Sequence, residues 1–205
     1  MRSANYSLTA LLVGGGAMLV LTAPIGVSQH ILQSNLPHVV IETELGDIEI
    51  VVDTVSAPNT AANFLRYAAA SHYTGGRFYR TVTMQNQPDD SIRIEVIQGG
   101  ANHDRRDARY PPIALERTSV TGLSHVDGTV SMARAGPNTA RAEFFICIGD
   151  QPELDFAGRR HTDGQGFAAF GRVVNGMEVV RKIHSQAAEG QRLRPVVRIV
   201  GARLR

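Results

Sequence analysis

Short apolar segments separated by turn-forming residues make up most of the chain beyond residue 38. Over 39–52, apolar and polar positions alternate on either side of a Leu45-Gly46-Asp47 turn, which predicts a two-stranded hairpin. Further short apolar segments lie at 78–82, 92–97, 128–133, 144–148, 167–173 and 195–204. Because these segments are closely spaced and bounded by Gly, Pro and Asp, they favour a closed antiparallel barrel or sandwich over a doubly wound sheet.

Two segments have the spacing of an amphipathic helix. The first begins near Ser56, the expected N-cap, holds Pro58 in its first turn and stops at the turn over 73–76. Its apolar positions are Ala61, Phe64, Leu65 and Ala68. The second covers 176–185 and carries Met177, Val180 and Ile183 on one face.

The amino-terminal stretch differs from the rest of the chain because residues 3–41 contain no Asp, Glu, Lys or Arg. Within it, residues 8–25 form an apolar run behind a short head that carries Arg2, which is the order of a secretory signal peptide. Gly26 and Ser28 are small enough for the positions that precede a cleavage site. An uncleaved membrane anchor is the alternative, because about 18 apolar residues are close to the minimum that spans a bilayer as a helix.

A helix inside the folded core is a poorer interpretation of this run, because glycines at 14–16 interrupt it and Pro24 lies near its end. Both other interpretations predict export to the periplasm, where an uncleaved run would tether the protein to the inner membrane. We therefore expect a signal peptide or anchor over 1–28, a short linker over 29–38 and one folded domain over 39–205.

The composition fits one ordinary domain without a strongly charged surface. The chain has 205 residues, with 21 Lys and Arg against 19 Asp and Glu, so its formal net charge is only +2. This balance does not indicate a nucleic-acid partner, and we expect a monomer. Cys147 is the one cysteine, which excludes an intramolecular disulfide, and its apolar neighbours are typical of a buried small side chain.

The motifs of several common kinds of catalyst are missing from the sequence. Ser131 lacks the Gly-x-Ser-x-Gly setting of a hydrolase nucleophile, and no catalytic triad can be argued from it. The seven histidines show neither a His-x-x-x-His pair nor a cysteine partner, so a zinc site is not indicated. Since there is also no Walker loop and no Gly-x-Gly-x-x-Gly turn before a helix, we predict no metal and no nucleotide cofactor.

Five motifs, in one order along the chain, carry a family resemblance. They are Phe78-Tyr79-Arg80, Gln98-Gly99-Gly100, the run 131–139, Phe144-Phe145-Ile146-Cys147 and the run 170–177. Together they resemble the successive signatures of the cyclophilin family of peptidyl-prolyl cis-trans isomerases and cover nearly all of 39–205. The resemblance implies a mainly β fold, a closed antiparallel barrel of roughly eight strands capped by two helices, in agreement with the apolar pattern.

The resemblance also implies a reaction and the residues that carry it. Such an enzyme rotates the peptide bond before proline, against a resonance barrier of about 18–20 kcal/mol, and cleaves no bond. As conjugation is lost, the proline nitrogen regains a lone pair, to which the Arg80 guanidinium would donate a hydrogen bond. Gln98 would hold the substrate backbone near the rotating carbonyl. The implied substrate-binding residues are Val96, Phe145, Leu154 and Phe167, which form a pocket for the proline ring, and Ala133 and Arg134, whose backbone pairs with the residue before proline.

Several positions depart from the family pattern. Glu95 stands where an aromatic residue is common, which predicts a carboxylate in the wall of the pocket. The other departures are Arg134 for asparagine, Glu143 for glutamine, Glu153 for the tryptophan associated with cyclosporin binding, Phe167 for histidine, and an apparent insertion over 85–90. These changes bear on substrate preference and drug sensitivity more than on the rotation itself, because Arg80, Gln98 and Phe145 are all present.

These features predict an exported cyclophilin-type isomerase that acts on X–Pro bonds of folding polypeptides without a metal or nucleotide. Two alternatives stay open. One is a non-catalytic proline-binding or holdase module on the same fold, which a carboxylate from Glu95 in the pocket would favour. The other is an envelope interaction protein that tethers partners through the polar loop over 98–109 and the leader.

Overall fold

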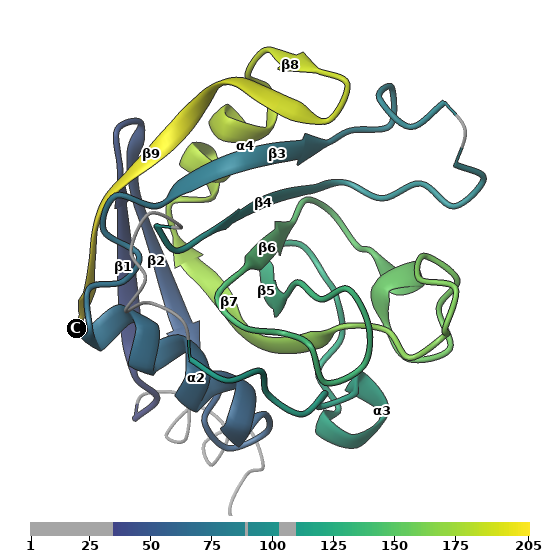
Figure 1. The fold of residues 1–205 in the computed structure, drawn as a ribbon, viewed down its shortest axis with the longest axis horizontal. Helices are drawn as coiled ribbons and strands as arrows, with labels where there is room; N and C mark the ends of the chain where they lie inside the picture. Colours follow the sequence, from purple (N-terminus) through teal and green to yellow (C-terminus); the bar gives the residue numbers. More distant parts are fainter. Residues whose placement is uncertain (1–34, 89, 103–109) are drawn as a thin grey trace, which may run out of the picture. The chain divides into compact units, whose positions relative to one another are not determined.

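The computed structural model describes residues 35–88, 90–102 and 110–205, in a folded unit that begins at Leu36 (Figure 1). The predicted signal peptide or anchor, most of the linker, and the 103–109 part of the polar loop lie outside these residues. Within the described part of the chain, none of the helices combines the length and hydrophobicity that crossing a bilayer requires.

The described residues form one antiparallel sheet that closes on itself. Its strands are β1 (His38–Thr43), β2 (Gly46–Val52), β3 (Arg77–Val82), β4 (Val96–Gly100), β5 (Thr129–Met132), β6 (Phe144–Cys147), β7 (Ala168–Asn175), β8 (Ala188–Glu189) and β9 (Arg192–Leu204). Their spatial order is β1-β2-β7-β5-β6-β4-β3-β9-β8, and β1 also pairs with β9. Eight strands therefore close a barrel, while β8 pairs with β9 alone, and the predicted mainly β, closed antiparallel barrel is confirmed.

The strands lie close to where the apolar pattern predicts them. The first strand starts at His38, one residue before the predicted domain boundary, and pairs with β2 from His38–Val51 to Thr43–Gly46. The segment over 92–97 is an exception, because its strand begins only at Val96 and continues through Gly99 and Gly100. Glycine fits there, since a Cβ on Gly99 would lie 2.8 Å from the Arg77 carbonyl oxygen.

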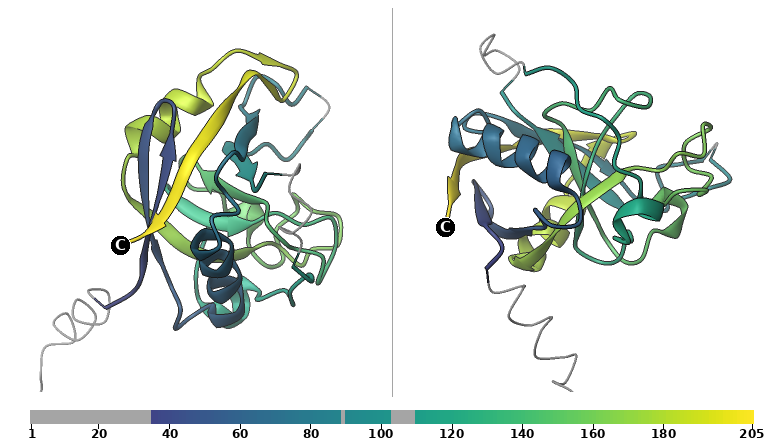
Figure 2. Two further views of the ribbon diagram at one scale, coloured as in Figure 1. Left: turned by 60° about the vertical axis from the view of Figure 1, so that its left-hand side comes forward. Right: turned by 90° about the horizontal axis from the view of Figure 1, so that it is seen from below.

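Two helices, α2 (Pro58–Ala69) and α4 (Met177–His184), lie at opposite ends of the barrel (Figures 1 and 2). Both were expected from their apolar spacing. A further helix of four residues, α3 (Thr118–Thr121), and a 3₁₀ turn, η2 (Pro152–Leu154), lie in the connections and were not predicted. Such short helices have too few residues to show a periodic pattern.

The start of α2 differs from the prediction. Ser56 is not its N-cap, because the helix begins after Ala57, whose side chain has no oxygen to accept a hydrogen bond. The Glu116 carboxylate takes this role from a distant loop, accepting the backbone N–H groups of Asn59 at 3.0 Å and Thr60 at 2.7 Å. These first-turn donors have no partner within the helix, so a long-range carboxylate satisfies them.

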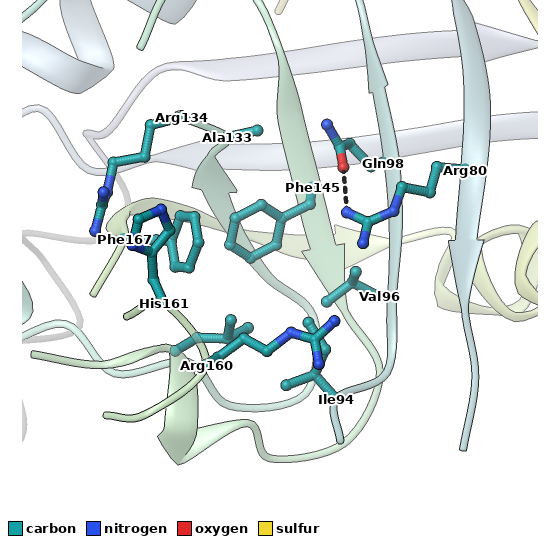
Figure 3. Close-up of a pocket in the computed structure, with 11 residues that line it drawn as sticks. Arg80, Ile94, Val96, Gln98, Ala133, Arg134, Phe145, Arg160, His161 and Phe167 are labelled. Atoms are coloured by element: carbon teal, nitrogen blue, oxygen red, sulfur yellow. Dashed lines mark hydrogen bonds between the residues drawn. The ribbon is translucent and has the colours of Figure 1, made fainter. Parts of the chain in front are cut away.

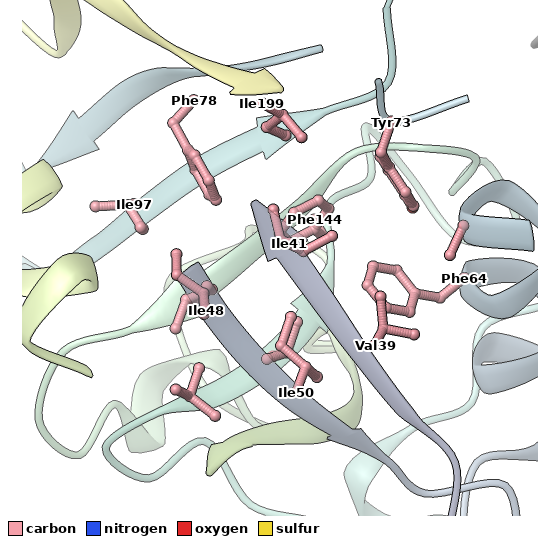
Figure 4. Packing of buried hydrophobic residues seen from close by; sticks show 14 of the residues in the cluster. Val39, Ile41, Ile48, Ile50, Phe64, Tyr73, Phe78, Ile97, Phe144 and Ile199 are labelled. Atoms are coloured by element: carbon pink, nitrogen blue, oxygen red, sulfur yellow. The ribbon is translucent and has the colours of Figure 1, made fainter. Parts of the chain in front are cut away.

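Aromatic rings fill the interior of the barrel (Figure 4). Phe64 of α2 packs edge-to-face on Phe144 of β6, with ring centroids 5.5 Å apart, and lies 5.2 Å from Tyr73. A second, smaller apolar cluster comprises Val82, Ile94, Val96, Phe145, Cys147 and Leu154. Because side chains alternate along a strand, Phe144 enters the interior while its neighbour Phe145 joins the second cluster, which forms the floor of the site described next.

Candidate active site

A pocket of about 260 Å³ opens over the second apolar cluster (Figure 3). It is lined by Arg80, Ile94, Val96, Gln98, Ala133, Arg134, Phe145, Leu154, Arg160, His161 and Phe167. This set includes all eight residues that the sequence indicated, brought together from β3, β4, β6 and the loops that follow β5 and β6. Residues more than 80 positions apart thus meet in one place, as a catalytic or binding site requires.

The floor of the pocket is apolar and close-packed. Val96, Phe145 and Leu154 are almost fully buried, and the ring of Phe167 stands perpendicular to that of Phe145 with centroids 5.3 Å apart. An edge-to-face pair of this kind has a fixed geometry. The floor is therefore a shaped, dry surface suited to a small apolar ring.

Arg80 faces this floor from the edge of the barrel, and two glutamines fix its guanidinium. Its Nη1 donates to Gln98 Oε1 at 2.8 Å, and Gln98 is its direct partner on the neighbouring strand β4. Its Nε and Nη2 both donate to Gln191 Oε1, at 2.9 and 2.6 Å. A register shift between Phe78 and Arg80 alters the alternation of β3 at this point. The guanidinium is thereby held in one orientation before any ligand arrives.

The hydrogen bonds continue from Gln98 into the protein. Gln98 Nε2 donates to the hydroxyl of Tyr79 at 2.7 Å, and that hydroxyl donates to Glu143 Oε2 at 2.5 Å. Burial and the nearby charge of Glu143 raise the pKa of Tyr79 far above its usual range, so the hydroxyl keeps its proton. This series of hydrogen bonds orients the Gln98 amide, with its oxygen toward Arg80 and its nitrogen toward Tyr79.

The pocket is electropositive as well as apolar. Burial, and secondarily the positive charge of Arg160, lowers the pKa of Arg80 from its ordinary value. Arg160 is itself anchored, since its Nη1 donates to the Ile92 carbonyl at 2.6 Å and pairs with Asp90 at 2.9 Å. Asp90 ends the apparent insertion over 85–90, so this inserted loop contacts the rim of the pocket.

The Arg134 side chain supports the pocket wall and is almost completely buried. It forms two hydrogen bonds to the Asp163 carboxylate, at 2.7 and 2.9 Å, and its Nε donates to the Gly166 carbonyl at 2.8 Å. These hydrogen bonds from Arg134 are the main cause that holds the pKa of Asp163 well below its usual range. The guanidinium also lies 5.0 Å from the centre of the Phe167 ring. Arg134 therefore fixes the loop that carries Phe167.

The prediction that Glu95 lines the pocket is wrong. Its carboxylate lies on the other side of the chain, 4.0 Å from His184 Nε2 of α4. The pocket is instead lined by Ile94 and Val96, its neighbours in sequence, because alternate side chains point to opposite faces of an extended segment. Glu153, expected at another family position, pairs with Arg159 at 2.8 Å and is not among the lining residues.

Below the pocket, Ser131, His125 and Asp155 form a hydrogen-bonded row that the sequence did not reveal. The His125 ring lies 2.9 Å from Ser131 Oγ and 2.7 Å from Asp155 Oδ1. Sequence reasoning missed the row because the fold, not a motif, brings these residues together. Ser131 is fully buried and lines no part of the pocket, whereas His125 stacks on the Phe145 ring at 5.9 Å. The row therefore supports the floor and offers no exposed nucleophile.

Two further features concern reactive side chains. Cys147 is fully buried, and burial raises the pKa of its thiol, which confirms the prediction of a buried small side chain. Within residues 35–88, 90–102 and 110–205, no three His, Cys, Asp or Glu side chains are arranged to hold a metal ion.

The pocket residues that sequence reasoning missed are Ile94, Arg160 and His161, and it also missed Gln191, which bonds to Arg80 without lining the pocket. None of them belongs to a motif quoted for the family. Gln191 lies 111 residues from Arg80 in sequence, so only the closed barrel brings it into contact. Alternation with Val96 was the one signal that could have identified Ile94.

Known proteins share both the sequence and the fold of this chain. The family model of cyclophilin type peptidyl-prolyl cis-trans isomerases (Cyclophilin type peptidyl-prolyl cis-trans isomerase/CLD) matches residues 38–204. Peptidyl-prolyl cis-trans isomerase A of Dickeya dadantii is 34% identical over 154 residues, which cover 74% of this chain and 73% of that protein. The peptidyl-prolyl cis-trans isomerase of Acinetobacter baylyi is 33% identical over 158 residues, covering 77% and 76%.

A solved structure gives the same result for the fold. The cyclophilin type isomerase of Cryptosporidium parvum, crystallised in the presence of the dipeptide Ala-Pro, aligns with a TM-score of 0.65 at 20% identity, covering 82% of this chain and 98% of that one. The family match runs from the first strand of the barrel to the last, and the sequence relatives are covered over most of their length. This chain therefore belongs to the cyclophilin family of peptidyl-prolyl cis-trans isomerases.

Proposed function

We propose that Arg80 stabilises the twisted X–Pro bond in this isomerase and that Gln98 positions the substrate backbone beside it. The observation that carries the proposal is the Arg80 guanidinium, held by two glutamines at the edge of a shaped apolar pocket. Half-way through the rotation the proline nitrogen is no longer conjugated and can accept a hydrogen bond. A preorganised charged donor at this position favours the transition state over the planar ground states.

The apolar floor gives the proline ring its place. Burial of the ring on Val96, Phe145, Leu154 and Phe167 fixes one side of the rotating bond, so that the carbonyl side turns. The backbone of Ala133 and Arg134, at the end of the pocket away from Arg80, binds the residue that precedes proline (Figure 3). A proline-containing polypeptide is thus the substrate class that this proposal assigns.

The test is isomerisation of a proline peptide by Arg80→Ala. Loss of one preorganised donor typically lowers a rate by about 10²–10³-fold, and we expect a fall of this size in kcat/KM. Arg203→Ala, which removes an exposed arginine paired with Glu42, is the matched control and should leave the rate unchanged. A rate enhancement that survives Arg80→Ala, with the fold intact by circular dichroism, would falsify the proposed role.

The holdase alternative loses the observation that favoured it, because Glu95 does not line the pocket. We further propose that the enzyme acts on folding proteins outside the cytoplasm, a proposal supported by the charge-free stretch over 3–41 and its apolar run. The intact mass of the protein recovered from cells tests this. Loss of about the first 28 residues indicates a cleaved signal, and a full-length chain in the membrane fraction indicates an anchor. A full-length chain in the soluble cytoplasmic fraction would contradict export.

A further inference from the structure

A second hollow, of about 470 Å³, adjoins the pocket along β3 and β9. It is lined by Arg77, Tyr79, Arg80, Gln191, Arg192 and Val196, and is called the basic groove below. The two strands lie side by side on the wall of the barrel (Figure 1) and pair antiparallel, with Arg80 opposite Arg192. Arg80 lines both the pocket and the groove, so the two form one continuous surface.

The charge of the groove is not neutralised from within. Half of its lining residues are arginines and none is acidic. The Tyr79 hydroxyl donates a hydrogen bond to the carboxylate of Glu143, which does not line the groove. The groove therefore presents positive charge to whatever lies in it.

The side chains of two of these arginines have no partner in the described part of the chain. Across the described residues, the side chains of Arg77 and Arg192 form neither a hydrogen bond nor an ion pair. The other exposed arginines of β9 behave differently. Arg194 pairs with Glu189 at 3.2 Å, Arg198 with Glu44 at 3.0 Å, and Arg203 with Glu42 at 2.7 Å. Among the described residues, each arginine of β9 outside the groove thus has a glutamate partner from another segment, whereas Arg192 in the groove has none.

The orientation of the substrate in the proposed mechanism leads into this groove. That mechanism assigns the residue before proline to Ala133 and Arg134, at the end of the pocket away from Arg80 (Figure 3), and the ring to the pocket floor. The chain after proline therefore leaves past Arg80, where the groove begins. An extended chain advances about 3.3 Å per residue, so the second and third residues after proline reach the unpaired arginines.

We propose that the basic groove is a subsite for acidic side chains at the second and third positions after the substrate proline. The proposal rests on the function proposed above, because it uses that orientation of the peptide. Carboxylates of Glu or Asp would receive hydrogen bonds from Arg77 and Arg192. Polypeptides with acidic residues shortly after proline are then the preferred substrates of this enzyme.

Two peptides of the form Ala-Ala-Pro-Ala-X-X-Ala, with X as Glu or as Gln, test the proposal on the full-length protein. NMR exchange spectroscopy gives kcat/KM for each. Exposed charge pairs change such values modestly, and we expect the Glu peptide to be favoured about two- to tenfold at low ionic strength. In 1 M salt, where the screening length is about 3 Å, the ratio should approach one.

The double variant Arg77→Gln, Arg192→Gln should also bring the Glu-to-Gln ratio close to one. Arg203→Gln removes a charge from the same strand outside the groove and should retain the wild-type ratio. The ratio is taken within each variant, so a general change in activity cancels. A wild-type ratio of one or less at low salt overturns the proposal, and so does a preference that persists in the double variant.

Equilibrium binding separates this proposal from the mechanism on which it rests. Fluorescence anisotropy with labelled versions of the same peptides measures affinity without any rotation. If the protein accelerates neither peptide but binds the Glu peptide more tightly than the Gln peptide, and only with Arg77 and Arg192 present, then the catalytic proposal fails and the subsite stands. Equal affinity for both peptides overturns the subsite.

Discussion

At the scale of single residues, the orientation of Arg80 depends on Gln191, a side chain that does not itself line the pocket. An arginine side chain has about 2 kcal/mol of rotamer entropy to lose when it is fixed. Gln191 Oε1 removes part of this cost in advance, because it accepts two N–H groups of the same guanidinium. Gln191 is thus a positioning residue for the proposed donor.

Gln191→Ala should lower kcat about tenfold with a smaller effect on KM, because the guanidinium loses two charge-assisted hydrogen bonds and its fixed direction. Gln191→Glu keeps an oxygen in the same place and should restore most of the rate. Exchange spectroscopy over a range of peptide concentrations separates kcat from KM. An unchanged kcat in Gln191→Ala would count against positioning, and so would an equal loss in both variants.

At the scale of elements, α2 depends on a carboxylate outside the helix. The Glu116 carboxylate accepts hydrogen bonds from the backbone N–H groups of the first turn. It also accepts hydrogen bonds from the side chains of Asn59, at 3.0 Å, and Thr60, at 2.5 Å. No residue next to the helix in sequence provides an equivalent cap, since Ala57 precedes Pro58 directly. The loop before α3 and the start of α2 are therefore stabilised together.

Glu116→Ala should lower the free energy of unfolding by about 1–3 kcal/mol, because it leaves several donors without their acceptor. Urea denaturation measures the change. Glu189→Ala, which removes an exposed glutamate paired with Arg194, is the control and should cost less than about 1 kcal/mol. If Glu116→Ala lowered the free energy of unfolding no more than Glu189→Ala does, the hydrogen bonds from Glu116 to α2 would not stabilise the protein.

The difference between local patterns and contacts between distant residues explains what the sequence could predict. Strands and helices with a periodic apolar face, such as the 39–52 hairpin and α4, were predicted correctly because the pattern and the burial have one cause. Features that depend on distant parts of the chain were not. Glu116 and Gln191 carry no local signal, and β8 has only two residues. The family resemblance supplied the eight pocket residues, yet it misplaced Glu95, whose side chain alternates with those of Ile94 and Val96 and so points away from the pocket.

At the scale of the whole molecule, ion pairs connect the first hairpin to the last strand. Glu42, Glu44 and Glu49 pair with Arg203, Arg198 and Arg205, at 2.7, 3.0 and 2.9 Å respectively. The pKa of Glu44 is lowered, first by the hydrogen bond from the Arg198 backbone N–H. The pKa of Glu49 is lowered as well, first by its hydrogen bond with His38 and further by the charge of Arg205.

These shifts predict a loss of stability in acid. A carboxyl whose pKa is lower in the folded than in the unfolded chain stabilises the fold fully above its unfolded pKa, about 4.3 for Glu, and loses that contribution as the pH falls through the folded value. The free energy of unfolding should thus decrease from pH 5 to pH 3. In the double variant Glu44→Gln, Glu49→Gln, the free energy of unfolding, measured by urea titration at each pH, should decrease less steeply than in the wild type. The same pH dependence in both proteins would show that these two carboxyl groups do not cause the loss of stability.

The pairing of β1 with β9 also sets a condition on how the protein is made. A ribosome releases β1 well before β9, and the two strands meet through partners such as Glu42 and Arg203, which are 161 residues apart. The barrel therefore cannot close before β9 has been synthesised, and the nascent chain carries open strand edges until then. Folding that depends on such distant contacts is slow, and exposed edges can pair with other chains. A chain of this topology thus exposes unpaired strand edges to other chains until the strand that closes the barrel has been made.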